Sequence, residues 1–120
     1  FPTPHKDLEV WQKAIAFVTD VYNQTGNFPK EEIYGLVSQL RRSAVSVPSS
    51  IAEGAARQSN KEYIQFLYVA LGSLMEVDTQ LSIANNLNFL TDETLIELQG
   101  KSDEIGKMLN GLIKYRKSKL

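Results

Sequence analysis

The ionisable residues that could do chemistry are few and lie far apart in this chain. Glu53, Glu76 and Asp78 are the carboxylates that could hold a metal ion or run acid–base catalysis. Di-iron helical bundles need a Glu-x-x-His motif on each of two helices, but the only histidine is His5. Cysteine, a glycine-rich phosphate loop and a Ser-His-Asp set are all lacking. The sequence therefore predicts a non-enzyme without metal or other cofactor, and His5 as an ordinary surface residue.

Basic residues near the end of the chain offer a different chemistry, the binding of phosphates. The net charge is −1 and the pI is about 5.8, whereas a dedicated nucleic-acid binder is usually basic. Charge is nevertheless segregated if the chain folds as four consecutive antiparallel helices. One end then carries Lys6 and Arg57 together with the residues predicted to contact phosphates, which are Lys61, Lys114, Arg116, Lys117 and Lys119. The acids at the same end are Asp7, Glu9, Glu53 and Glu62. The other end carries Glu31, Glu32, Asp92, Glu93 and Glu97, with Lys30.

A polar stripe follows the face of the predicted second helix that is opposite Ala44. At about 100° per residue this stripe comprises Arg42, Ser46, Ser49, Glu53 and Arg57. It could contact a neighbouring subunit, or a phosphate backbone through its arginines. Alternatively, it is a solvated face with one Glu–Arg pair four residues apart.

Turn-forming residues divide the chain into four predicted helices. These cover residues 7–24, 30–56, 60–86 and 91–117, after an extended arm at residues 1–6. No stretch alternates as a strand does, and the connections are short. Short connections favour antiparallel neighbours. The sequence thus predicts a single all-α domain, 1–120, folded as an antiparallel up-down-up-down four-helix bundle.

Apolar periodicity predicts which faces lie inward. The second helix has the seam Ile33, Val37, Leu40, Ala44, Val47 and Ile51, with a kink at Pro48. The third turns Tyr63, Leu67, Ala70, Leu74, Val77 and Leu81 inward. The first has two adjacent stripes, Leu8-Trp11-Ile15-Val18-Tyr22 and Val10-Ala14-Phe17-Val21. Val69, Gly72 and Ile83 lie on the outward side of the third helix. With the doubled stripe of the first helix, they leave more apolar surface than one bundle can bury. We therefore expect a homo-oligomer.

Level matching of the second and third helices predicts two ion pairs. In an antiparallel hairpin Arg42 is level with Glu76, and Arg41 is close to Asp78. An acid beside the apolar arc is costly unless it is paired. The pairs would hold the two helices together, unless Asp78 simply reaches solvent past a short neighbour.

The segment 39–54, QLRRSAVSVPSSIAEG, also resembles the hallmark helix of the 23S ribosomal RNA intervening-sequence proteins. The similarity rests on Gln39, Leu40, Arg41, Arg42, Ser46, Pro48, Ile51, Ala52, Glu53 and Gly54, and departs at Ser50, commonly Asn in that family. The resemblance implies a four-helix bundle that forms a ring-like homo-oligomer, typically a pentamer. It also implies relatives encoded inside ribosomal RNA insertions, and basic retroelement accessory proteins that bind nucleic acid. The family has no settled activity.

Two functional hypotheses remain open from the sequence. The first is a homo-oligomeric bundle that acts as a scaffold or binds RNA or DNA at its basic end. The second is a protein–protein interaction module without a nucleic-acid ligand, whose basic tail only solubilises a helix end. No apolar run approaches the roughly 18 residues of a membrane span, so neither hypothesis includes a membrane. The cysteine-free composition fits a cytoplasmic location.

Overall fold

The protein is all-α, and a computed structural model describes every residue from 1 to 120. Its helices are α1 (Glu9–Thr25), α2 (Leu36–Ala55), α3 (Asn60–Asn86) and α4 (Asp92–Lys117). Two short 3-10 helices, η1 (Pro4–Asp7) and η2 (Lys30–Glu32), precede α1 and α2. The predicted fold class, a four-helix bundle without strands, is confirmed.

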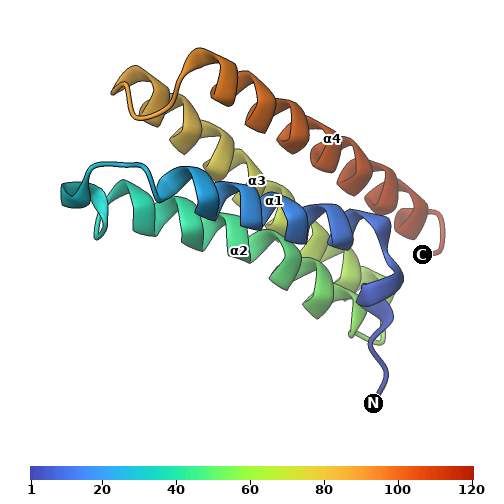
Figure 1. The fold of residues 1–120 in the computed structure, drawn as a ribbon. Coiled ribbons are helices and arrows are strands. Elements are labelled where there is room, and N and C mark those ends of the chain that lie inside the picture. Colours follow the sequence, from blue (N-terminus) through green and yellow to red (C-terminus); the bar gives the residue numbers. More distant parts are fainter.

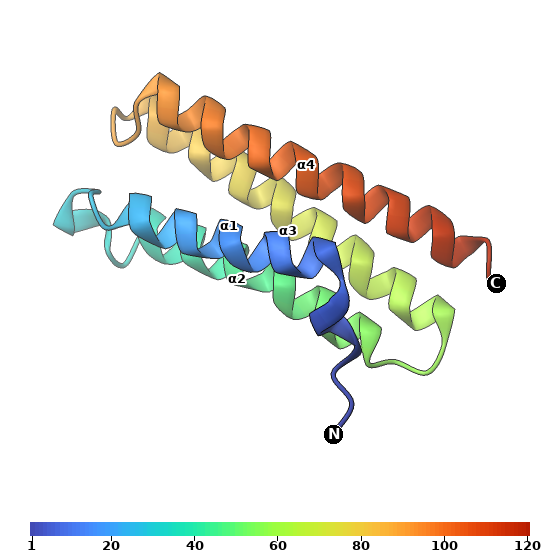
Figure 2. The same cartoon turned by 45° about the vertical axis from the view of Figure 1, so that its right-hand side comes forward.

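The sequence colours run in opposite directions along consecutive helices in both views of the ribbon (Figures 1 and 2). α2 packs against α1 and α3, and α4 packs against α3 and α1. α1 and α3 share no packing contact, so these two helices are diagonal neighbours. Both chain termini and the α2–α3 connection lie at one end of the bundle, and the other two connections lie at the opposite end (Figures 1 and 2).

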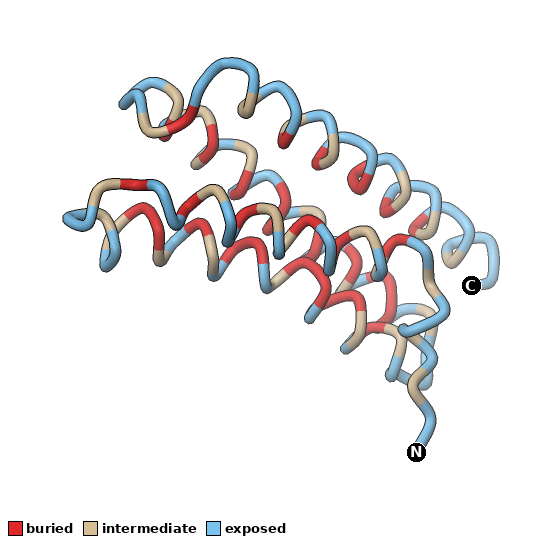
Figure 3. The backbone as a smooth tube through the Cα atoms, in the orientation of Figure 1, coloured by how far each residue is buried: buried red, intermediate tan, exposed pale blue.

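Buried residues line the inner faces of all four helices (Figure 3). Every residue predicted to point inward from α3, from Tyr63 to Leu81, is at most 5% exposed. These side chains join Leu40 and Val47 of α2 and Leu109 of α4 in one continuous apolar core. Removing this apolar area from water is the main force that holds the helices together.

Helix α2 continues through Pro48, which is buried. Proline has no N–H, so the Ala44 carbonyl lacks its usual helical partner. Further along α2, a Cβ placed on Gly54 would lie 2.9 Å from Phe66 Cβ and 3.1 Å from Tyr63 Cδ1. Only a residue without a side chain allows α2 and α3 to approach so closely, which explains the glycine in the hallmark segment.

Two boundaries differ from the prediction. The second helix was expected from residue 30, but Lys30–Glu32 is a 3-10 turn and α2 begins only at Leu36. Gly35 interrupts the helix with φ −113° and ψ −112°. Ile33 consequently lies outside the core seam and is 54% exposed. The N-terminal arm is likewise not extended throughout, because Pro4–Asp7 forms a 3-10 turn.

Side-chain caps fix the starts of α3 and α4. Ser59 Oγ accepts a hydrogen bond from the Glu62 N–H at 3.2 Å, and Thr91 Oγ1 accepts one from the Thr94 N–H at 3.1 Å. Each hydroxyl satisfies an N–H that has no partner within the helix. α3 therefore begins at the predicted residue 60, and α4 begins at Asp92, one residue after the predicted start.

Candidate interaction surfaces

The predicted phosphate-binding residues come from two helix ends that share one pole of the bundle. Lys61 opens α3, and Lys114, Arg116 and Lys117 close α4, with Lys119 just beyond. The views in Figures 1 and 2 put the start of α3 and the end of α4 at the same pole. Lys61 and Lys114 are exposed, and neither forms an ion pair. These two lysines are therefore available to bind an anion.

Three further cations of this basic pole, those of Arg57, Lys117 and Lys119, lie over aromatic rings. The Arg57 guanidinium carbon lies 4.7 Å from the Phe66 ring centroid. Lys117 Nζ is 5.3 Å from the Tyr68 ring, and Lys119 Nζ is 5.2 Å from the Tyr115 ring. Distances within about 6 Å allow a cation–π attraction. Sequence reasoning missed these pairs because each joins a cation to a ring whose orientation the helical period does not specify.

Arg116 has a structural position rather than an open one. Its guanidinium carbon lies 4.5 Å from the Tyr63 ring centroid, and its Nη1 donates to Asn60 Oδ1 at 3.3 Å. Burial raises the pKa of the Tyr63 hydroxyl above its ordinary value, although the nearby Arg116 partly opposes that shift. Arg116 therefore covers the end of the core at the basic pole, and its charge is less available to a ligand than that of Lys61 or Lys114.

The predicted polar stripe on α2 is only partly an outer face. Arg42, Ser49, Glu53 and Arg57 are exposed, as expected. Ser46 instead points towards α3, where its hydroxyl lies 2.9 Å from Ser73 Oγ. Ser46 thus belongs to the contact between the two helices rather than to a binding surface.

Neither predicted ion pair between α2 and α3 forms. Arg42 and Glu76 line the same shallow groove, so their levels match, but their charged atoms are more than 4.0 Å apart. Glu76 accepts a hydrogen bond from Ser43 Oγ at 3.2 Å. Arg41 turns to α1, where its Nε donates to Thr25 Oγ1 at 2.9 Å. Asp78 remains half-buried without a cationic partner.

Arg41 makes a further contact with α1 that the sequence did not indicate. Its guanidinium carbon lies 4.4 Å from the Tyr22 ring centroid, and its Nη2 is 3.4 Å from the Tyr22 carbonyl oxygen. A hydroxyl, a carbonyl and a ring face together satisfy the guanidinium. An acidic partner for Arg41 is therefore unnecessary.

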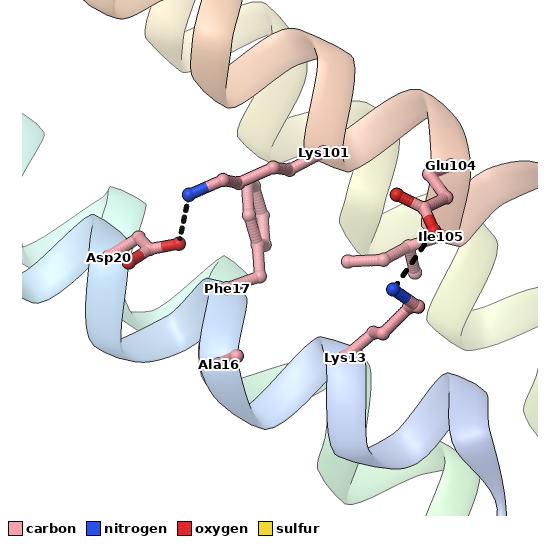
Figure 4. A pocket seen from close by; sticks show the side chains of 7 residues that line it. All are labelled: Lys13, Ala16, Phe17, Asp20, Lys101, Glu104 and Ile105. Carbon is pink, nitrogen blue, oxygen red and sulfur yellow. Dashed lines mark hydrogen bonds and ion pairs between the residues drawn. The ribbon is translucent and has the colours of Figure 1, made fainter.

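Ion pairs do occur between α1 and α4. Lys13 Nζ lies 3.0 Å from Glu104 Oε1, and Lys101 Nζ lies 2.8 Å from Asp20 Oδ2. The two pairs flank a cleft of about 210 Å³ with Phe17 between them (Figure 4). The Glu104 hydrogen bond raises the pKa of Lys13, and the Asp20 hydrogen bond raises the pKa of Lys101. Level matching of the first and fourth helices would have predicted both pairs.

An apolar strip remains uncovered on the outer side of α1 and α2. Ile15, Tyr22 and Val45 form its central part, and each is about 40% exposed. They border two grooves that meet at Val45, one also lined by Trp11, Val18 and Pro48, and the other by Ile33 and Tyr34. We call these residues the outer strip. Sequence reasoning anticipated surplus apolar surface on α1, but not the contribution of Val45, Ile33 and Tyr34.

The chain has neither a cluster of potential metal ligands nor a helix that could span a membrane. Nowhere do three or more His, Cys, Asp or Glu side chains gather as metal ligands would. None of the helices combines the length and the apolar character needed to cross a membrane.

The sequence comparisons agree with the four-helix architecture. The model of the family described as "23S rRNA-intervening sequence protein" matches residues 6–111. This chain belongs to that family. The match includes the whole hallmark segment, α1 to α3 and most of α4, and no curated protein matches the chain.

A solved structure with the same fold comes from Bacteroides thetaiotaomicron. It is a protein of unknown function from the S23 ribosomal protein family, determined at 1.70 Å resolution. It shares 25% sequence identity with this chain, with a TM-score of 0.81 over 88% of this chain and 95% of that one. The likeness extends over nearly the whole bundle, and neither comparison indicates catalysis.

Proposed function

We propose that this protein is a non-enzymatic, self-associating four-helix bundle whose assembled basic poles bind the phosphates of RNA or DNA. The observation that carries the proposal is the pairing of two surfaces on one chain. An uncovered apolar strip follows the sides of α1 and α2, and uncommitted lysines lie at one end. Side-by-side association of copies would bury the strip and bring several basic poles together.

The position of a second apolar strip favours a ring over a two-fold dimer. Val69 and Ile83 lie on the outside of α3 at 53% and 44% exposure, and Gly72 between them has open space above it. Gly72 and Ile83 line a groove with Gln39 of α2 that contains no residue of the outer strip, so they belong to a different face of the bundle. Contact between different faces of successive copies closes into a ring when the rotation permits. Membership of the family makes a pentamer the expected ring.

Binding in this proposal is to phosphates and independent of base sequence. No helix presents the grouped Asn, Gln and Arg side chains that read base edges. Lysine ammonium groups are point charges that suit phosphate oxygens. A chain with net charge −1 would therefore bind nucleic acid only through the assembled pole. A cytoplasmic location, expected from the composition, fits this ligand.

The second candidate function is a protein-interaction module without a nucleic-acid ligand. The observation in its favour is that Arg57, Arg116, Lys117 and Lys119 all contact aromatic rings within the chain. In that case the cations mainly cover the end of the core. The outer strip would then dock a different protein.

The test combines light scattering after size exclusion with a nucleic-acid shift assay at several salt concentrations. The proposal expects a mass of several chains and an affinity that falls steeply as salt rises, because phosphate binding releases counterions. Replacing Lys61 and Lys114 with Gln should weaken binding to every sequence and leave the mass unchanged. An assembly that binds neither RNA nor DNA at low salt would favour the protein-interaction module.

A further inference from the structure

One exposed tyrosine lies against the basic pole in a way that the phosphate proposal does not explain. Tyr68 of α3 is 47% exposed, and Lys117 Nζ from α4 lies 5.3 Å from its ring centroid. A tyrosine that only completed a core would be buried, as Tyr63 is at 5%. The Tyr68 ring is instead held at the surface with a cation beside it.

A row of lysines on α4 leads to this tyrosine. Lys107, Asn110, Lys114 and Lys117 follow one another at spacings of three, four and three residues, and all are exposed. Residues at these spacings share one face of a helix. At about 1.5 Å per residue the row is about 15 Å long. Asp103, the preceding residue on this face, lies one turn before Lys107.

The facing side of α3 continues the same surface. Lys61, Gln65 and Tyr68 are exposed and are spaced by four and three residues, so they share a face of α3. The contact between Lys117 and Tyr68 joins this face to the α4 row. We call the combined surface the lysine lane, formed by Lys61, Gln65, Tyr68, Lys107, Asn110, Lys114 and Lys117.

We propose that the lysine lane binds single-stranded nucleic acid, with the lysines on the phosphates and a base stacked on the Tyr68 ring. The inference rests on the proposed function and specifies its ligand. A charged row with an exposed aromatic ring is the arrangement that binds single strands without sequence preference. A duplex keeps its bases paired inside the helix, so it can use the lysines but not the ring.

The experiment measures fluorescence anisotropy of the full chain with three labelled probes of one length, about 16 nucleotides, near the upper end of known single-strand site sizes. The probes are oligothymidylate, an abasic strand with the same phosphates, and a duplex. The wild type should bind oligothymidylate most tightly. Tyr68→Ala should weaken that binding about 5- to 150-fold, the range of a lost base–aromatic stack, and leave abasic binding unchanged.

Matched variants separate the ring from the charges. Ile96→Ala removes an apolar side chain that is 71% exposed near the start of α4, at the other end of the bundle and outside both apolar strips and the lysine lane, and it should bind all three probes as the wild type does. Lys107→Gln and Lys114→Gln should weaken all three probes. For single strands each should flatten the salt slope by about 0.7.

The outcomes distinguish this inference from the proposed function. Equal affinity for oligothymidylate and the abasic strand, with Tyr68→Ala unchanged and the lysine variants weakened, would leave phosphate binding intact and overturn stacking. An assembly mass altered by Tyr68→Ala would show that the ring belongs to a subunit contact, and would also overturn it. Failure of all three probes to bind would remove the proposed function itself.

Discussion

The two apolar stripes of α1 are similar in sequence but differ in their surroundings. Val10, Ala14, Phe17 and Val21 are each at most 5% exposed. Ile15 and Tyr22, in the neighbouring stripe, are each 41% exposed, although both have large side chains that are mainly apolar. The first stripe packs on the core of its own chain, whereas the second is only partly covered: Trp11 and Val18 are partly buried, and Arg41 lies over the Tyr22 ring.

This difference shows that the apolar content of α1 has two separate roles. Burying the inner stripe stabilises the bundle by removing apolar area from water. Leaving the outer one exposed gives a folded chain no benefit, and contiguous exposed apolar surface is typical of an interaction site. Changes to the inner stripe should therefore affect folding, and changes to the outer strip should affect assembly.

The largest effect is expected at the inner stripe. Phe17→Ala removes a ring that is 1% exposed and leaves a cavity, which should cost about 3–5 kcal/mol in the free energy of unfolding. The control is Ile15→Ala in the second stripe of α1. It should lower the free energy of unfolding much less, because the Ile15 side chain is already partly in water. Urea denaturation measures both, with the assembled mass recorded so that like species are compared. Equal losses would show that the stripes do not differ.

A smaller effect is expected where α2 and α3 approach most closely. Gly54→Ala places a methyl group against Phe66 and Tyr63, which should destabilise the fold by about 1–3 kcal/mol. Gly100 of α4 has open space around it, so Gly100→Ala should stabilise the helix by about 0.5–1 kcal/mol. Thermal unfolding shows whether each variant is less or more stable than the wild type. A neutral Gly54→Ala would show that the neighbouring rings move aside easily.

Sequence reasoning could predict elements whose boundaries depend on local chemistry. Ser59 and Thr91 mark the starts of α3 and α4 because a side-chain hydroxyl can satisfy an exposed N–H. The predicted start of α2 was wrong because apolar periodicity does not distinguish the 3-10 turn Lys30–Glu32 from one more turn of α-helix. Only the backbone at Gly35 shows that the helix starts anew at Leu36.

The candidate site was less predictable because it depends on contacts between helices. A helical wheel gives the direction in which each side chain leaves one helix, and level matching gives its position along the bundle axis. Neither shows which neighbouring helix a long side chain reaches. Arg41 was expected on Asp78 and instead reaches Thr25 and Tyr22. The periodicity of α1 likewise defined both stripes and could not say which one the bundle would bury.

The smallest effect is expected at the ion pairs between α1 and α4. The pKa values of Lys13 and Lys101 are raised in the folded chain above 10.5, and that of Tyr63 above 10.0. A raised folded pKa gives stability that is complete below the unfolded value and is lost as pH rises through the folded one. Stability should therefore fall slightly above about pH 10, since exposed pairs contribute little.

Urea midpoints between about pH 9 and about pH 11 measure this loss. Replacing Lys13 and Lys101 with Met should make the fall shallower, and adding Tyr63→Phe should reduce it further. A midpoint that rises with pH over this range would contradict the sign.

The central claim is that the outer strip joins copies of this chain, and the assembled mass of one variant tests it most directly. Ile15→Glu combined with Val45→Glu places two charges on the strip, at positions already about 40% exposed. The account predicts a wild type of several chains, and a variant that has the mass of one chain, 13.5 kDa, with unchanged helical content by circular dichroism. A wild type that is already a monomer, or a variant that keeps the wild-type mass, would contradict it.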